Sequence, residues 1–411
     1  MFVEKKMCRL CHGAALERFF DLGEQPPANS FLAPKDFDSE KYFPLCVARC
    51  RNPECGFVQL VHVVDPEILF SGYLYVSSTS PVFVKHFEEY AKTMDVRLHL
   101  RGAFTLDIGS NDGVLVKPLK ELGALALGVD PAREIAERAT SEGYETITGY
   151  FSESYAKELA AARGKAKLIT ANNVFAHIDD LDDVVRGVRT LLSQSGLFVI
   201  EAPYLLDYLE QKLFDTTYHE HLSYLAIRPL QAFFTRHDMH IVDVMRVNTH
   251  GGSVRIMVAH LDSPHTPAPV VGSMIREEEE KGLHESAVYH QFAQDVLENK
   301  NKLRELLIGL KQKGAKIAGY GAPAKGNTLL NFIQIGRETL EYIVDDNPLK
   351  QGLYSPGMHI PVVSRVHMEK RPPDYLLILA WNFATSIIEK NTQFQVNGGK
   401  FIIPVPMPRI V

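Results

Sequence analysis

The sequence lacks any apolar run long enough to cross a bilayer. Although 45% of its 411 residues are hydrophobic, no stretch approaches the roughly 20 residues that a spanning helix requires. Residues 1–9 also carry too much charge to form the apolar core of a signal peptide. We therefore expect a cytoplasmic protein without a membrane partner, long enough for two or three domains.

An excess of positive charge is also missing. The chain has 44 Lys and Arg against 50 Asp and Glu, a net charge of -6, whereas sequence-independent binding of nucleic acid requires a clustered basic surface. No fixed-period repeat is present, and the acidic tract Glu277–Glu280 is typical of a solvated helix face. We expect a small-molecule ligand, whose negative charges must be met by local Lys and Arg.

Cysteine is scarce and confined to one end of the chain. All five cysteines lie in residues 1–55, and four form two close pairs, Cys8 with Cys11 and Cys50 with Cys55. Because a cytosolic chain disfavours disulfides and so short a segment cannot fold on its own core, the pairs predict a zinc site with four thiolate ligands. Four thiolates leave no open coordination position, so the zinc is expected to be structural.

The zinc-binding module is expected to span residues 1–65. Cys46 stands outside both pairs and is expected to be a buried thiol, whereas His12 is an alternative ligand beside Cys11. The rival interpretation is a nucleic-acid zinc ribbon, which would need a basic face that this segment lacks.

A strand and glycine turn organise the middle of the chain. The apolar run 104–108 predicts a buried parallel strand, and Gly109 opens a turn at its carboxyl end, where open α/β sheets bind ligands. Asp107 and Asp112 flank this turn, and carboxylates attract the ammonium and sulfonium of S-adenosylmethionine but repel a pyrophosphate. With Asn111 they predict a methyl-donor site; the alternative is an NAD-binding Rossmann unit.

Two later strand ends extend this site. The run 124–130 ends in Asp130, at the spacing where such folds hold the hydroxyl pair of a ribose. The run 167–172 leads into Asn172 and Asn173. Both ends are expected at the carboxyl edge of one sheet, where the amides would orient the donor or an acceptor hydroxyl.

Residues 66–262 therefore predict one cofactor domain. Parallel strands are expected at 104–108, 124–130, 167–172 and 196–202, alternating with helices. The β-rich runs 239–247 and 253–261 then predict the antiparallel final hairpin typical of class I methyltransferases. Before the first strand, the hydroxyl-rich run 73–80 and a helix at 84–98 suggest a lid over the donor, although an ordinary loop and helix is the alternative.

A dense polar cluster follows the strand at 196–202. It reads Tyr218, His219, Glu220, His221, Leu222, Ser223 and Tyr224. Imidazole titrates near neutral pH and a carboxylate such as Glu220 stabilises its charged form, which favours general-base chemistry. A zinc site is the alternative, but no HExxH motif is present. His177, just beyond the strand at 167–172, is expected in the same crevice or packed as a core histidine.

Residues 263–411 predict a second, smaller Rossmann-like domain. Strands are expected near 316–320, 341–345, 375–380 and 401–404, after a long helical pattern. The turn after its first strand carries Lys325 and no acid, which suits a phosphate at a helix amino terminus. One alternative is that this region is a degenerate duplicate of the first Rossmann-like domain that serves only in packing. The other is that it binds NAD through the GxGxxxxG pattern. Arg255 of the preceding hairpin is expected to help neutralise the phosphate.

Six features in this order resemble one known family. They are the paired-cysteine module, LDIGSNDG, NNVFAHI, TYHEHLSY, THGGSVR and GYGAPAKG. Together they resemble the sugar C-methyltransferases that add a branch methyl at C3 of TDP-linked keto-deoxysugars, over essentially the whole chain. One departure is the second cysteine pair, whose CxxxxC spacing is longer than relatives commonly show.

The resemblance implies roles for particular residues. Tyr218, Glu220 and His221 match the family's catalytic YHEH stretch, with His221 as the base. His177 would lie in the active site, and Tyr75 matches an amino-terminal tyrosine of the family. The C-terminal domain would hold the nucleotide-sugar and its glycine turn the diphosphate. The substrate-binding residues expected are Tyr224, Arg255, Tyr320, Lys325, Asn327 and Lys350.

The predicted architecture is α/β: a class I methyltransferase Rossmann-like domain flanked by a small N-terminal zinc-binding module and a second, C-terminal Rossmann-like domain. The expected reaction is methylation at C3 of a nucleotide-linked 4-keto-6-deoxysugar through an enolate, using S-adenosylmethionine and a structural zinc, in a monomer or weak homo-oligomer. The alternatives are sugar O- or N-methylation and NAD-dependent oxidoreduction of a nucleotide-sugar.

Overall fold

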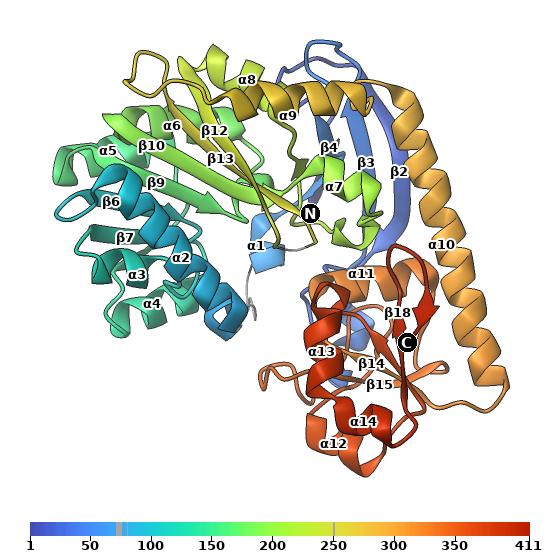
Figure 1. The fold of residues 1–411 in the computed structure, drawn as a ribbon. Coiled ribbons are helices and arrows are strands. Elements are labelled where there is room, and N and C mark those ends of the chain that lie inside the picture. Colours follow the sequence, from blue (N-terminus) through green and yellow to red (C-terminus); the bar gives the residue numbers. More distant parts are fainter. Residues whose placement is uncertain (71–75, 80, 250) are drawn as a thin grey trace.

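The computed structural model describes residues 1–70, 76–79, 81–249 and 251–411 (Figure 1). Its central sheet has the strand order β12-β13-β10-β9-β6-β7-β8. The parallel strands are β6 (Phe104–Ile108), β7 (Leu125–Asp130), β8 (Thr146–Thr148), β9 (Ala166–Asn172) and β10 (Leu192–Pro203). The antiparallel hairpin of β12 (Met239–Val247) and β13 (Ser253–His260) pairs with β10. The predicted class I arrangement is confirmed.

Helices cover both faces of this sheet because its strands are apolar on both sides. On β10, Phe198 and Ile200 pack into one hydrophobic cluster, whereas Leu197 and Val199 pack into another on the opposite face. The second cluster is covered by α2 (Pro81–Leu98) and α3 (Val116–Glu121), the first by α6 (Leu181–Leu191) and α8 (Ile227–Arg236). α4 (Arg133–Ser141) packs on β7 and β8, and α5 (Glu153–Arg163) packs on α6.

The N-terminal module shares a sheet with the middle of the chain. Its antiparallel strands are β2 (Leu16–Gln25), β3 (Phe43–Cys50) and β4 (Val58–Leu60), and β1 (Phe2–Glu4) pairs separately with β5 (His62–Val64) before the short α1 (Pro66–Phe70). The edge strand beyond β4 is β11 (Ser223–Tyr224), with Ser223 opposite Gln59. The polar cluster at 218–224 is therefore attached directly to the cysteine-bearing module.

The C-terminal region forms its own sheet, in the order β16-β15-β14-β17-β18-β19. The strands are β14 (Ile317–Tyr320), β15 (Leu340–Val344), β16 (Val362–Val363), β17 (Tyr375–Ile378), β18 (Lys400–Ile403) and the antiparallel β19 (Arg409–Ile410). Its helices are α11 (Ala324–Ile333), α12 (Arg365–Lys370), α13 (Ala384–Lys390) and α14 (Thr392–Val396). The second Rossmann-like domain is thus confirmed.

Two helices join the central sheet to this region. α9 (Pro269–Glu280) leads into α10 (Ser286–Gln312), which runs beside β2 and down to the C-terminal sheet (Figure 1). The contact is aromatic: the ring centroids of Phe19 and Tyr289 lie 4.9 Å apart. None of the helices described here, α10 included, is both long and apolar enough to cross a membrane.

Candidate active site

A cavity of about 620 Å³ lies where the three regions meet. It extends past the carboxyl ends of β6, β7 and β9, past the polar turn before β11, and to the amino end of α11. The predicted site residues on its wall are Asp107, Gly109, Asn111, Asp130, Asn172, Asn173, His177, Tyr218, Glu220, His221, Lys325 and Lys350. Residues separated by more than 200 positions in the sequence therefore share one chamber.

The turn after β6 is shaped for close approach of a ligand. Gly109 has a φ of +69°, and a Cβ there would come within 2.5 Å of Val174, so only glycine fits. The backbone N–H of Asn111 donates to Asp130 Oδ2 at 2.8 Å, and that of Ala132 donates to Asp130 Oδ1 at 2.8 Å. The first of these bonds ties the turn after β6 to the end of β7.

Buried carboxyls give this end of the cavity its character. Burial raises the pKa of Asp107 to about 7, and Thr170 Oγ1 donates to Asp107 Oδ1 at 2.6 Å. Burial also raises the pKa of Asp130. Within the part of the chain that the structure describes, Asn173 Oδ1 is buried without a hydrogen-bond partner. Carboxyls that are costly to ionise alone, beside an unsatisfied amide oxygen, fit the ammonium and sulfonium of S-adenosylmethionine.

Asp112, predicted to bind the donor, contacts a neighbouring loop. It is not among the described residues on the cavity wall. Its Oδ2 instead accepts the backbone N–H of Ser78 at 3.2 Å. The glycine turn points this carboxylate towards the segment that precedes α2, so Asp112 supports the loop.

The polar turn and the end of β9 bring two imidazoles together. The ring centroids of His177 and His221 lie 5.0 Å apart, and those of Tyr218 and His221 lie 3.9 Å apart. Glu220 is buried, and Asn29 Nδ2 donates to its Oε1 at 2.7 Å. Tyr75, the remaining predicted catalytic residue, lies outside the described residues.

The two histidines of the YHEH stretch have different environments. His219 is 1% exposed, and its Nε2 donates to the Phe43 carbonyl at 3.2 Å. Burial lowers the pKa of His219 to about 4, so this ring is neutral at physiological pH. Both rings line the cavity, but His221 is only half-buried, so it is the imidazole of this stretch that fits proton transfer.

The far wall of the cavity carries two lysines. Lys325 lies in the first turn of α11, donates to Asn382 Oδ1, and sits 4.1 Å from the centroid of the Trp381 ring. Burial lowers the pKa of Lys325 to about 8, against the opposing attraction of Asp215. Lys350 Nζ donates to the Ala322 carbonyl at 2.8 Å. With the α11 amino terminus beside them, the lysines form an end suited to an anion.

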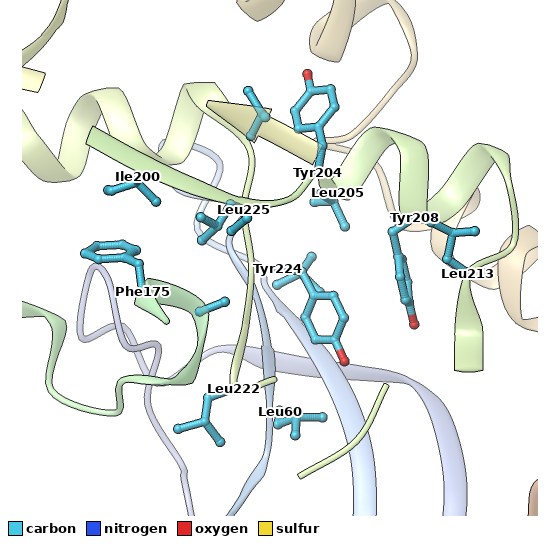
Figure 2. Close-up of a cluster of buried hydrophobic side chains, with 14 of the residues drawn as sticks. Leu60, Phe175, Ile200, Tyr204, Leu205, Tyr208, Leu213, Leu222, Tyr224 and Leu225 are labelled. Atoms are coloured by element: carbon cyan, nitrogen blue, oxygen red, sulfur yellow. The ribbon is translucent and has the colours of Figure 1, made fainter. Parts of the chain in front are cut away.

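Two tyrosines predicted to bind the substrate pack in hydrophobic cores. Tyr224 belongs to the hydrophobic core that Figure 2 shows, where its ring centroid lies 4.9 Å from that of Tyr208. Tyr320 packs in the core of the C-terminal sheet. Neither is among the described residues that line the cavity, because each faces the interior of its own sheet.

Arg255 and Asn327, also predicted to bind the substrate, contact other parts of the chain. Both are buried polar residues whose partners are other parts of the chain. Arg255 Nη2 lies 2.8 Å from Glu201 Oε2, and its guanidinium stacks 3.8 Å from the centroid of the Tyr90 ring. Asn327 Nδ2 donates to the Ala28 carbonyl at 2.7 Å. Neither is on the described cavity wall.

The predicted metal ligands form one cluster. The sulfur atoms of Cys8, Cys11, Cys50 and Cys55 all lie within 4.8 Å of one another. The pairs are interleaved, with Cys8 Sγ 3.7 Å from Cys55 Sγ and Cys11 Sγ 3.5 Å from Cys50 Sγ. This donor set is that of a structural zinc. His12 is instead paired with Asp182, its Nε2 lying 2.9 Å from Oδ2.

Sequence reasoning missed two asparagines of the site. Asn29 reaches Glu220 from the N-terminal module, and Asn382 accepts from Lys325 after β17. Both line the cavity. Neither lies in a recognisable motif, and each meets its partner only through the packing of distant regions.

The parallel sheet with its antiparallel hairpin and acidic pocket defines a class I S-adenosylmethionine-dependent methyltransferase. Three family models match in order: a zinc binding domain at residues 8–70, a methyltransferase domain at 85–244 and a C-methyltransferase C-terminal domain at 248–406. The C-methyltransferase NovU of Streptomyces niveus is 36% identical over 98% of this chain and 96% of its own. The chain belongs to the S-adenosylmethionine-dependent C-methyltransferase family, and it uses that donor and a structural zinc.

Two more distant matches each cover less than half of this chain. A ubiquinone biosynthesis O-methyltransferase of Burkholderia orbicola is 27% identical over 38% of this chain and 73% of its own. The crystal structure of magnesium protoporphyrin IX methyltransferase from Synechocystis with bound SAH is 15% identical, covering 43% of this chain and 82% of its own, with a TM-score of 0.34.

Proposed function

We propose that this enzyme methylates C3 of a nucleotide-linked 4-keto-6-deoxysugar, with TDP as the nucleotide. The observation that carries the proposal is one cavity lined both by carboxyls at strand ends of the central sheet and by lysines of the C-terminal region. Asp107 and Asp130 come from strand ends of the central sheet and Lys325 and Lys350 from the C-terminal region, and the paired imidazoles of His177 and His221 line the same cavity. A cationic methyl donor and an anionic sugar nucleotide are matched by that division of charge.

The chemistry assigned to the centre is carbon methylation through an enolate. The C4 ketone acidifies the C3 hydrogen, and His221 takes that proton as general base. Electrons of the broken C–H bond pass to the ketone oxygen, where Tyr218 or His177 stabilises the enolate. The enolate carbon forms a bond to the methyl group of the donor, whose carbon–sulfur bond breaks with its electrons staying on sulfur.

Positioning is the remaining task of the site. The base and the methyl group must lie on opposite faces of C3, within a chamber that excludes water. Glu220, held by Asn29 at 2.7 Å, is proposed to fix the catalytic turn and to stabilise the charged imidazole that His221 becomes when it takes the proton. The donor contacts are assigned to Asp107, Gly109, Asn111, Asp130, Asn172 and Asn173.

The diphosphate is assigned to the amino end of α11. Pro323, Ala324 and Lys325 line the cavity there, and α11 starts without a side-chain cap on its backbone N–H groups. Such N–H groups bind phosphate oxygens, and a lysine beside them adds a full charge.

The test is a mass spectrum of reactions with TDP-, GDP- and CDP-linked ketosugars. We expect one added methyl group, carried on carbon, on the TDP-linked 4-keto-6-deoxysugar. In D₂O without donor, the enzyme should also exchange the C3 hydrogen of that sugar. Methylation on oxygen or nitrogen, or turnover of a substrate whose C3 is blocked, would refute the enolate route.

A further inference from the structure

Arg9 links the zinc knuckle to the catalytic centre. It stands between the ligands Cys8 and Cys11, yet its side chain is only 2% exposed and is directed into the protein. Burying a guanidinium is costly unless acceptors match its N–H groups. Arg9 Nε and Nη1 have such acceptors, whereas Nη2 has none among the described residues. Of the three acceptors of the Arg9 side chain, one lies in β4 and the other two lie in the segments that carry the site's imidazoles.

The first segment is the catalytic turn. Arg9 Nη1 donates to the Leu222 carbonyl at 3.0 Å and to the Leu60 carbonyl at 2.9 Å. Leu222 directly follows His221, and the Leu60 backbone N–H donates to that same Leu222 carbonyl at 2.9 Å. The guanidinium therefore clamps the turn onto β4 at the position next to the proposed base.

The second segment is the loop after β9. Arg9 Nε donates to Asp179 Oδ1 at 3.0 Å, and Asp179 lies two residues beyond His177. Lys5 Nζ contacts the other carboxylate oxygen of Asp179 at 2.6 Å, from a more exposed position. One guanidinium thus bridges the segments whose imidazole centroids are 5.0 Å apart.

The knuckle itself is fixed in place. The Arg9 backbone N–H donates to Gln59 Oε1 at 2.8 Å, and Gln59 Nε2 donates to the Met7 carbonyl at 3.1 Å. Gln59 also stands opposite Ser223 in the β4–β11 pair. Because Cys8 and Cys11, two of the predicted zinc ligands, flank Arg9 in the sequence, the backbone of Arg9 is fixed on both sides.

We propose that Arg9 is a positioning residue, through which the zinc knuckle sets the relative placement of His177 and His221. The proposal rests on the proposed role of His221 as base. The metal site would then stabilise the N-terminal module and also help to position the two imidazoles. A planar guanidinium with donors in a fixed fork serves three acceptors in two directions, whereas a lysine ammonium is a point donor on a flexible stem.

The test uses Arg9→Met, which keeps the apolar stem, and Arg9→Lys, which keeps the charge. We expect kcat to fall about 10- to 100-fold in Arg9→Met, the range expected for a misplaced catalytic group, and to a smaller extent in Arg9→Lys. KM, donor affinity by calorimetry and zinc content should stay at wild-type values. Lys5→Ala is the matched control, because it removes a cation from Asp179 without touching either carbonyl, and it should retain wild-type kcat.

A second readout is independent of the substrate. The imidazole ¹³C–¹H NMR signals of His177 and His221, assigned with His177→Asn and His221→Asn, should shift in both Arg9 variants and stay unchanged in Lys5→Ala. Wild-type kcat with unchanged imidazole signals would overturn the proposal, and so would loss of zinc in step with activity. If Arg9→Met does not fold, Arg9→Lys decides by the same criteria. If the wild type methylates no ketosugar, the proposed function fails, while the NMR signals still decide the role of Arg9.

Discussion

The imidazoles of His177 and His221 lie with ring centroids 5.0 Å apart, although His177 is next to a strand of the central sheet and His221 is next to a strand of another sheet. His177 ends the short turn after β9, whereas His221 precedes β11, which belongs to the sheet of the N-terminal module. The pair therefore exists only when the cysteine-bearing module is docked on the central sheet. This dependence makes the active site a property of the whole chain.

His221→Asn should abolish methyl transfer, with kcat reduced at least about 100-fold, as expected on removal of a general base. Exchange of the C3 hydrogen in D₂O should disappear in parallel. Donor affinity, measured by calorimetry, should stay near the wild-type value because the carboxyls of the donor end are untouched. Full activity of this variant would remove His221 from the mechanism.

Donor binding should depend on pH through Asp107. With its pKa raised to about 7 by burial, this carboxyl is neutral below pH 7 and charged above it. A cationic donor favours the charged form, so affinity should rise with pH up to about 7, by at most about tenfold per pH unit, and then level off. Calorimetry at pH values on both sides of 7 measures this.

Asp107→Asn should weaken donor binding about tenfold or more at pH 8 and remove this pH dependence. Asp112→Asn is the control, since the Asp112 carboxyl accepts from the Ser78 backbone instead of lining the cavity. It should retain the wild-type pH profile. An unchanged profile in Asp107→Asn would place the donor's cation elsewhere.

The zinc site should be essential to stability. Cys11→Ser removes one of four clustered ligands and should lower zinc content and reduce the free energy of unfolding by more than about 4 kcal/mol, because binding of a structural metal is coupled to folding. Metal analysis and thermal unfolding check this. Cys46→Ala, at a buried cysteine outside the cluster, should keep its zinc; full zinc in Cys11→Ser would refute the four-thiolate site.

The features that could be predicted from the sequence are those that depend on local patterns. The strand ends at Asp107 and Asp130 and the cysteine pairs were located correctly because each depends on spacing over a few residues. The direction in which a polar side chain points does not depend on local spacing. Arg255 pairs with Glu201, 54 residues earlier, and Tyr224 turns into the core. Such contacts are set by tertiary packing, which one-dimensional periodicity does not encode.

The same limit hid the support around the catalytic turn. Asn29 and Arg9 lie in a module whose cysteines predict a structural zinc site. No sequence motif around them indicates that they contact Glu220 or the Leu222 carbonyl. Their role follows from the pairing of β4 with β11, a contact between strands about 165 residues apart in sequence.

The anionic end of the substrate should be bound by Lys325. Lys325→Met should lower kcat/KM for the nucleotide-sugar about 10- to 100-fold, the effect of losing a charge-assisted hydrogen bond, while donor affinity stays unchanged. Burial lowers the pKa of Lys325 to about 8, so its charge is present below pH 8 and lost above it. The wild-type kcat/KM should therefore decline as pH rises past 8, and this decline should be absent from Lys325→Met. Lys390→Met is the control, because Lys390 forms an exposed ion pair with Asp346. A wild-type kcat/KM and pH profile in Lys325→Met would show that the diphosphate is bound away from α11.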